Sequence, residues 1–392
     1  MHGDARNAVA ITVLNVFRGF AENVYRVFIS AYMAKLGYSM TSIGLVSALS
    51  SIIGALASPL VGFLLDVWSS RLITALTGFF TVASLLLVAC GGGVEVITIS
   101  YALFSLAFYF AQPARAVFLA RSVGVTRLGT VISLTTLPLL VIGVVAPVAG
   151  GILITVYGYA NTFLLLSLVA LIGTAVFLAL SREPGVAGDG RRQSLVEAYK
   201  SFLLPSKQFA SLYLFASIDR AAWSFWYPLL SAYLLSNGYT EFEIGSIQTI
   251  SSLVQALLTP LAGRLTDRFG AFLALTLSEA TVAVGVLLLV FPQAKPLVIA
   301  SMILTGASIA FWIPGYNTYI PKVFSNPGEV FASLNAVRSL VAVPVPYISG
   351  ALYDTLSPTT PFIASSAMLA IATYIAVTSL RKLETALPQS KK

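Results

Sequence analysis

Charged residues are scarce in this sequence. Only 10% of its 392 residues are Asp, Glu, Lys or Arg, whereas 57% are hydrophobic. Soluble domains carry roughly 25% charged residues, and a single soluble core of this length could not bury so much apolar surface. The composition therefore excludes an ordinary soluble globular protein and predicts a membrane protein.

Cysteine and histidine are nearly absent. Cys90 is the only cysteine and His2 the only histidine. A lone cysteine cannot form an intrachain disulfide, and a Cys/His metal cluster needs several ligands. We therefore expect no metal and no cofactor, and the lack of a nucleophile–histidine arrangement argues against an enzyme. If the protein moves protons, the side chains available inside the membrane are carboxylates.

Long stretches without any charged residue are present instead. Each exceeds the roughly 20 residues that cross a bilayer as a helix. They span residues 36–65, 72–94, 128–181, 296–321 and 355–380. Together with segments that a few charges interrupt, they predict an all-α membrane protein with twelve transmembrane helices. The predicted helices begin near residues 8, 41, 72, 96, 128, 160, 208, 243, 271, 296, 329 and 358.

The two halves of the chain repeat each other. Residues 31–66 align without a gap on residues 232–267, with 15 of 36 positions identical and an offset of 201. The same offset aligns Arg121 with Lys322. Parallel six-helix repeats are typical of secondary transporters, whose substrate site lies at the repeat interface near the bilayer midplane.

The repeat and the distribution of charge predict the domains and the topology. We expect a six-helix bundle at 1–181, a cytoplasmic linker at 182–207 with an amphipathic helix on the membrane surface, and a second six-helix bundle at 208–392. Sixteen Lys or Arg lie on one side of the predicted spans, and only Lys35 and Lys295 on the other. By the positive-inside rule, both termini are expected in the cytoplasm of a multi-pass protein of the cell membrane. The net charge of +8 then reflects topology and not nucleic-acid binding.

Two loop motifs carry a family resemblance. GRLTDRFG at 263–270 resembles the Gly-x-Leu-x-Asp-Arg-x-Gly signature of the major facilitator superfamily, and GFLLDVWSSR at 62–71 is its weaker copy. In the predicted fifth helix, GVVAPVAGG at 143–151 resembles the Gly- and Pro-rich motif common among proton-coupled exporters, with Ala146 where that motif has Gly. The resemblance covers the whole chain and implies a twelve-helix transporter of the drug/solute:proton type.

The loop motifs also predict gating residues. Asp66 and Asp267 end the second and eighth helices, and the repeat matches them with Arg121 and Lys322. We interpret these groups as latches that hold the cytoplasmic side closed, as the resemblance also implies, and we expect the motif glycines to allow close helix approach. The complete predicted gating set is Asp66, Arg71, Arg121, Asp267, Arg268 and Lys322.

Eight charged residues lie inside predicted helices. A charge near the bilayer centre costs roughly 2.5–3.5 kcal/mol, so such residues normally face a polar cavity or a partner. The resemblance places helices 1, 4, 7 and 11 around a central cavity, where seven of the eight would converge, and places Glu279 of helix 9 at the periphery. The predicted substrate-binding and coupling residues are Arg18, Glu22, Arg26, Arg115, Asp219, Arg220, Arg338, Trp226, Trp312 and Tyr316.

The pairing of these charges has two alternatives. Arg18 plus 201 is Asp219, so the repeat puts opposite charges at equivalent positions, where they could pair or clamp a substrate. Alternatively, Arg18, Glu22 and Arg26 neutralise one another on one helix face. Asp219 then pairs with Arg220 or Arg338.

The interior charges sum to five Arg and three acids, a net +2 that suits an anionic or zwitterionic substrate. We predict a monomeric secondary active transporter that works by alternating access and exports a small organic, amphipathic or anionic solute in exchange for protons. Glu22 or Asp219 would carry the proton. Proton-coupled uptake of an organic acid or other nutrient is the alternative, and a non-transporting membrane receptor is the alternative from another class.

Overall fold

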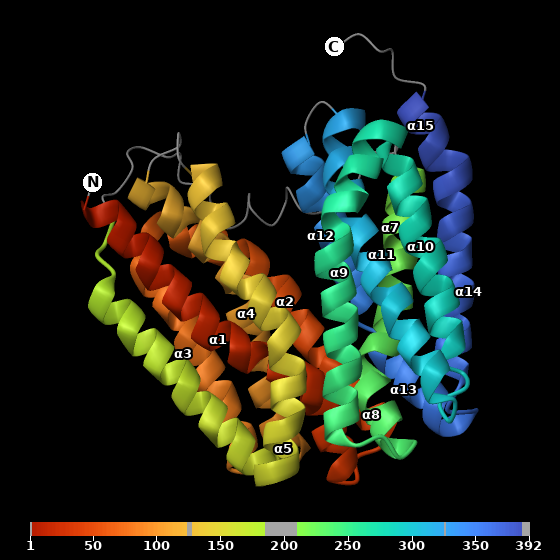
Figure 1. Cartoon of the computed structure of the whole chain (residues 1–392), viewed down its shortest axis with the longest axis horizontal. Helices are drawn as coiled ribbons and strands as arrows, with labels where there is room; N and C mark the ends of the chain where they lie inside the picture. The colour runs from red at the N-terminus through yellow and green to blue at the C-terminus, as the bar shows by residue number, and fades with distance from the viewer. Residues whose placement is uncertain (1, 124–127, 185–209, 325–326, 386–392) are drawn as a thin grey trace. The chain divides into compact units, whose positions relative to one another are not determined.

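The computed structural model describes residues 2–123, 128–184, 210–324 and 327–385, and all regular secondary structure in these ranges is helical (Figure 1). The helices of the first half are α1 His2–Lys35, α2 Met40–Val67, α3 Ser70–Ala89, α4 Val94–Val123 and α5 Leu128–Leu180. Gly158 interrupts α5 with φ 77° and ψ 171°. Because only glycine adopts this conformation without strain, the break falls there and divides α5 into two spans. The predicted turn before residue 160 is confirmed.

The second half repeats this plan with more breaks. Its elements are α7 Ala210–Trp226, η3 Tyr227–Leu229, α8 Leu230–Ser236, α9 Glu241–Phe269, α10 Ala271–Leu288, α11 Lys295–Val323, α12 Pro327–Ala342, α13 Val345–Thr355, α14 Thr360–Ile375, η4 Ala376–Leu380 and α15 Arg381–Thr385. Pro228 lies at the break between α7 and α8, and Pro344 at the break between α12 and α13. Proline removes a backbone donor and clashes with the preceding turn, so each of these spans is a pair of shorter helices.

Six spans in each half give the twelve that the sequence predicts. Eight helices of the described part are long and apolar enough to cross a membrane. Helix starts fall close to the predicted positions, as at Met40 and Ala271. The predicted amphipathic linker helix and the predicted start at 208 lie outside the described residues.

The chain forms two compact units, and each unit takes one short segment from the other half of the sequence. The first comprises the described residues of Met1–Tyr32, Leu49–Tyr199 and Thr240–Ser246. The second comprises those of Met33–Ala48, Lys200–Tyr239 and Ile247–Lys392. The start of α2 thus belongs with the second unit, and the start of α9 with the first.

Equivalent glycines allow these two helix starts to pack. In the second unit, a Cβ at Gly44 would lie 2.1 Å from the carbonyl oxygen of Pro346. In the first unit, a Cβ at Gly245, the repeat mate of Gly44, would lie 2.3 Å from the carbonyl oxygen of Pro147. Only a residue without a side chain fits at such a distance, so the backbones of neighbouring helices touch at both places.

Candidate functional site

The helix α1 charges form one close pair and one exposed group. Arg18 Nη1 lies 3.2 Å from Glu22 Oε1, and both side chains are largely buried. Thr81 donates a hydrogen bond of 3.0 Å to the same carboxylate oxygen. Arg26 is exposed and donates to Asn23. The structure therefore shows neutralisation within the helix for Arg18 and Glu22, whereas Arg26 takes no part in it.

Arg115 in α4 is a cation without a described carboxylate partner. Its side chain is half-buried and donates a 3.2 Å hydrogen bond to Gln112. Arg18 carries a like charge close enough to act on it, and the charge of Arg18 is already matched by Glu22. Arg115 is thus a cation in a membrane-spanning helix whose described side-chain partner is a neutral amide.

Four predicted residues gather in the second unit from three helices. Asp219 of α7 is 1% exposed and accepts a 2.9 Å hydrogen bond from Arg338 Nη2 of α12. The guanidinium carbon of Arg338 lies 4.8 Å from the ring centroid of Trp312 and 5.4 Å from that of Tyr316. The two α11 rings stack with 15° between their planes. The aromatic faces hold the guanidinium while its in-plane N–H groups remain free to reach the carboxylate.

The remaining predicted residues of α7 have different surroundings. Trp226 is fully buried and its ring lies 5.3 Å from Trp223 and 5.4 Å from Tyr227, between centroids. Trp226 is therefore a buried packing residue, whereas Trp223 and Tyr227 are partly exposed. Arg220 is half-buried, and its charge acts on Asp219.

At the start of α10 the structure brings Lys322 to an acid that the sequence analysis did not single out. Lys322 Nζ lies 3.7 Å from Glu384 Oε1. The Glu384 carboxylate also accepts hydrogen bonds from the backbone N–H groups of Ala271 and Phe272, at 3.0 and 2.8 Å. It caps the first turn of α10, where the helix dipole favours a negative charge. The repeat matches Lys322 with Asp267, but Asp267 is exposed and the described partner of Lys322 is Glu384.

The first half has an equivalent acid. Glu183 accepts hydrogen bonds from the hydroxyls of Ser69 and Ser70 at the start of α3. The offset of 201 relates Glu183 to Glu384, so the sequence repeat could have identified the two acids as an equivalent pair. Arg121 donates to the carbonyl oxygen of Leu65 at 2.9 Å.

The other members of the predicted gating set show mixed outcomes. Arg71 Nε donates to the Ser181 hydroxyl at 2.9 Å, and the guanidinium of Arg268 lies 5.2 Å from the Phe269 ring centroid. The side chain of Asp66 lies outside what the structure describes. The expected close helix approach at the motif glycines is wrong, because a Cβ at Gly62 or Gly263 would meet nothing within 4 Å in the described part.

The exporter-like motif in α5 makes close packing contacts. A Cβ at Gly151 would lie 2.5 Å from the carbonyl oxygen of Glu241 at the start of α9, and one at Gly150 would lie 2.6 Å from Val24 of α1. Pro147 of the motif also lies close to Gly245, so the motif packs against the first turns of α9. These contacts give the motif a packing role, whatever its part in coupling.

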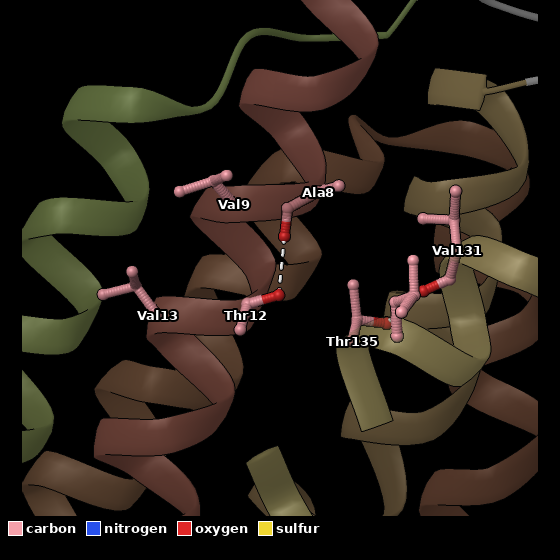
Figure 2. Close-up of a pocket in the computed structure, with 7 residues that line it drawn as sticks. Ala8, Val9, Thr12, Val13, Val131 and Thr135 are labelled. Carbon is pink, nitrogen blue, oxygen red and sulfur yellow. Dashed lines mark hydrogen bonds between the residues drawn. The ribbon is translucent and has the colours of Figure 1, made fainter. Parts of the chain in front are cut away.

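An apolar groove of about 240 Å³ lies between α1 and α5 of the first unit (Figure 2). Its lining residues are Ala8, Val9, Thr12, Val13, Val131, Leu134 and Thr135. The Thr12 hydroxyl donates to the Ala8 carbonyl oxygen at 2.8 Å (Figure 2), and the Thr135 hydroxyl donates to the Val131 carbonyl oxygen at 2.9 Å. Because both hydroxyls bond to their own helices, the groove offers hydrocarbon surface for an apolar group.

These features define a class of protein: a polytopic helical membrane protein with duplicated six-span halves and ionisable groups buried inside its spans. Residues 11–234 and 210–392 match the family model of the Major Facilitator Superfamily, and the chain belongs to this superfamily. It is therefore a multi-pass membrane transporter and not an enzyme. No curated protein in the comparison matches the chain.

Solved structures with the same fold align over nearly the whole chain. The nucleoside transporter NupG has 15% identity and a TM-score of 0.78, over 96% of this chain and 99% of that one. A bacterial homolog of the human lysosomal transporter Spinster has 13% identity and a TM-score of 0.76, with 97% of both chains covered. A POT family transporter in complex with 5-aminolevulinic acid has 13% identity and a TM-score of 0.77, with 96% of both chains covered. Identities this low show the fold alone.

Proposed function

We propose that the protein is a secondary active transporter that works by alternating access and carries a small organic anion or zwitterion with an apolar part. The observation that carries this proposal is Arg115, a half-buried cation whose described side-chain partner is the neutral Gln112. Arg18, whose positive charge acts on Arg115, forms an ion pair with Glu22. An arginine offers two parallel N–H donors to a carboxylate, phosphate or sulfonate.

Proton-coupled export remains our proposed direction and coupling. It is supported by the resemblance of GVVAPVAGG to the motif of proton-coupled exporters. Proton-coupled uptake of an organic acid or nutrient is the competing direction. We further propose that the protein acts as a monomer with both termini in the cytoplasm, and that the charged groups around the α2–α3 and α9–α10 loops act as latches.

Substrate class and coupling are tested together in proteoliposomes with an imposed pH gradient. Two probes separate the charge classes: 5-aminolevulinic acid, which carries a carboxylate, and a neutral nucleoside. The choice is motivated by two fold relatives, one described as a nucleoside transporter and one solved in complex with 5-aminolevulinic acid. We expect transport of the carboxylate probe, or of other organic anions in a wider panel, in preference to the nucleoside. Reversing the gradient assigns export or uptake, and binding without flux would favour a receptor.

Arg115 variants then test the site. Arg115→Gln should weaken binding of the transported anion by roughly 10- to 150-fold, because a hydrogen bond to a charged group contributes about 1.5–3 kcal/mol. Arg115→Lys should be intermediate, since it keeps the charge and loses the bidentate contact. Lys382→Gln, which removes an exposed positive charge from α15, is the control and should bind normally. Equal affinities for all these proteins would reject Arg115 as the anion site.

A further inference from the structure

Glu279 of α10 is a buried acid without a described partner. Its side chain is 0% exposed, and neither carboxyl oxygen has a hydrogen-bond partner in the described structure. The other acids buried in the described spans are matched: Glu22 by Arg18 and Thr81, and Asp219 by Arg338. An ionised carboxylate without a hydrogen bond is very unfavourable in an apolar interior, and such a group takes up a proton instead.

Several helices contribute residues to the surroundings of Glu279. The charges close enough to act on it are those of Asp219 on α7 and Arg338 on α12. From α11, Tyr316 contacts the guanidinium face of Arg338. The packed helix α14 has Tyr374 as its sole titratable residue, and that side chain is exposed. Glu279 therefore belongs to a three-residue charge cluster with Asp219 and Arg338.

These three residues comprise one cation and two acids, and Arg220 adds a second positive charge that acts on Asp219. With a proton on Glu279, the ionised Asp219 and the cationic Arg338 cancel, and the cluster is neutral. When the proton leaves for water, these three residues carry a net charge of −1. Arg338 is 17% exposed, whereas Asp219 and Glu279 are buried, so the arginine is the exposed member of the cluster.

We propose that Glu279 is a proton-binding site of this transporter, which holds one proton beside the Asp219–Arg338 pair and exchanges it with water during the transport cycle. Its role in transport rests on the proposed proton coupling. The assignment replaces Glu22 and Asp219, the two carriers expected from the sequence, because both are matched by arginine. The same site would serve exchange or co-transport, since each needs a group that binds a proton on one side and releases it on the other.

Infrared spectroscopy of the purified full-length protein tests the site without any substrate. A protonated carboxyl has a C=O stretching band distinct from that of a carboxylate, and the band shifts when the acidic hydrogen exchanges with deuterium. We expect this band near neutral pH, its exchange in heavy water, and its loss as the pH is raised. Glu279→Gln should abolish it, and Glu95→Gln, at the exposed start of α4, should keep it.

Asp219→Asn combined with Arg338→Gln keeps the experiment decisive if Glu279→Gln does not fold, because it removes the second acid without freeing Arg338 to ionise Glu279. Our proposal expects the band to persist in this double variant, and its loss there would place the proton on Asp219 and overturn the assignment. A band that neither exchanges nor changes with pH would show a permanently protonated structural acid, which also overturns it. Transport separates this proposal from the preceding one. If a pH gradient does not drive flux in the wild-type protein, the proposal of proton coupling is rejected. If the gradient drives flux equally well in the wild-type protein and in Glu279→Gln, the assignment of Glu279 as the proton-binding site is rejected.

Discussion

The pairing of Asp219 with Arg338 gives the sharpest prediction about stability. The perturbation is a double-mutant cycle of Asp219→Asn, Arg338→Gln and both together. Removing one partner of a buried ion pair costs about 3–5 kcal/mol, because the other charge stays in a site of low dielectric. Exposures of 1% and 17% leave little solvent screening here. Each single variant should therefore lose free energy of unfolding in that range.

The two losses should differ in size. Arg338→Gln also removes the guanidinium from the faces of Trp312 and Tyr316, a contribution of about 0.5–2 kcal/mol. It further leaves Asp219 beside Glu279 with no cation from α12. Asn at position 219 can still accept a hydrogen bond from Arg338. We expect Arg338→Gln to be the more damaging variant by about 1 kcal/mol.

The double variant should be less damaging than the sum of the two singles by about 1–3 kcal/mol. The assay is denaturant unfolding in detergent micelles, followed by tryptophan fluorescence. As a control, Glu95→Gln combined with Arg338→Gln should be additive within about 0.5 kcal/mol. Strict additivity of the Asp219 and Arg338 variants would refute the argument that this pair is energetically coupled.

Three further predictions concern the helix ends. Glu384→Ala removes the cap of α10 and should lower the free energy of unfolding by roughly 1–2 kcal/mol in the same titration; an unchanged midpoint would contradict the capping role. An added Cβ at Gly245 would lie 2.3 Å from the Pro147 carbonyl oxygen, so Gly245→Ala should reduce the yield of folded protein, whereas Gly263→Ala should not. Equal yields would argue against close packing. Asp267→Asn should fold normally but slow transport in vesicles, and unchanged turnover at equal expression would remove the latch hypothesis.

Several site features could have been read from the sequence but were not. The offset of 201 that aligns the two halves also relates Glu183 to Glu384, and in the structure these acids accept hydrogen bonds from the starts of α3 and α10. Glu279 stood out as a charge in an apolar segment, yet its equivalent in the first half is Gly78, so the repeat gave it no partner. Symmetry is informative only where both halves keep a residue of the same kind.

The sequence by itself determined the twelve spans, the duplication and the superfamily. These follow from the length of apolar runs and from motifs at a fixed offset, all of which can be read directly along the chain. The tertiary structure decided which charges meet. Asp219 and Arg338 are separated by 119 residues, and Lys322 and Glu384 lie on different helices. Their contact depends on the rotation and depth of each helix, which side-chain packing fixes and helical periodicity alone does not.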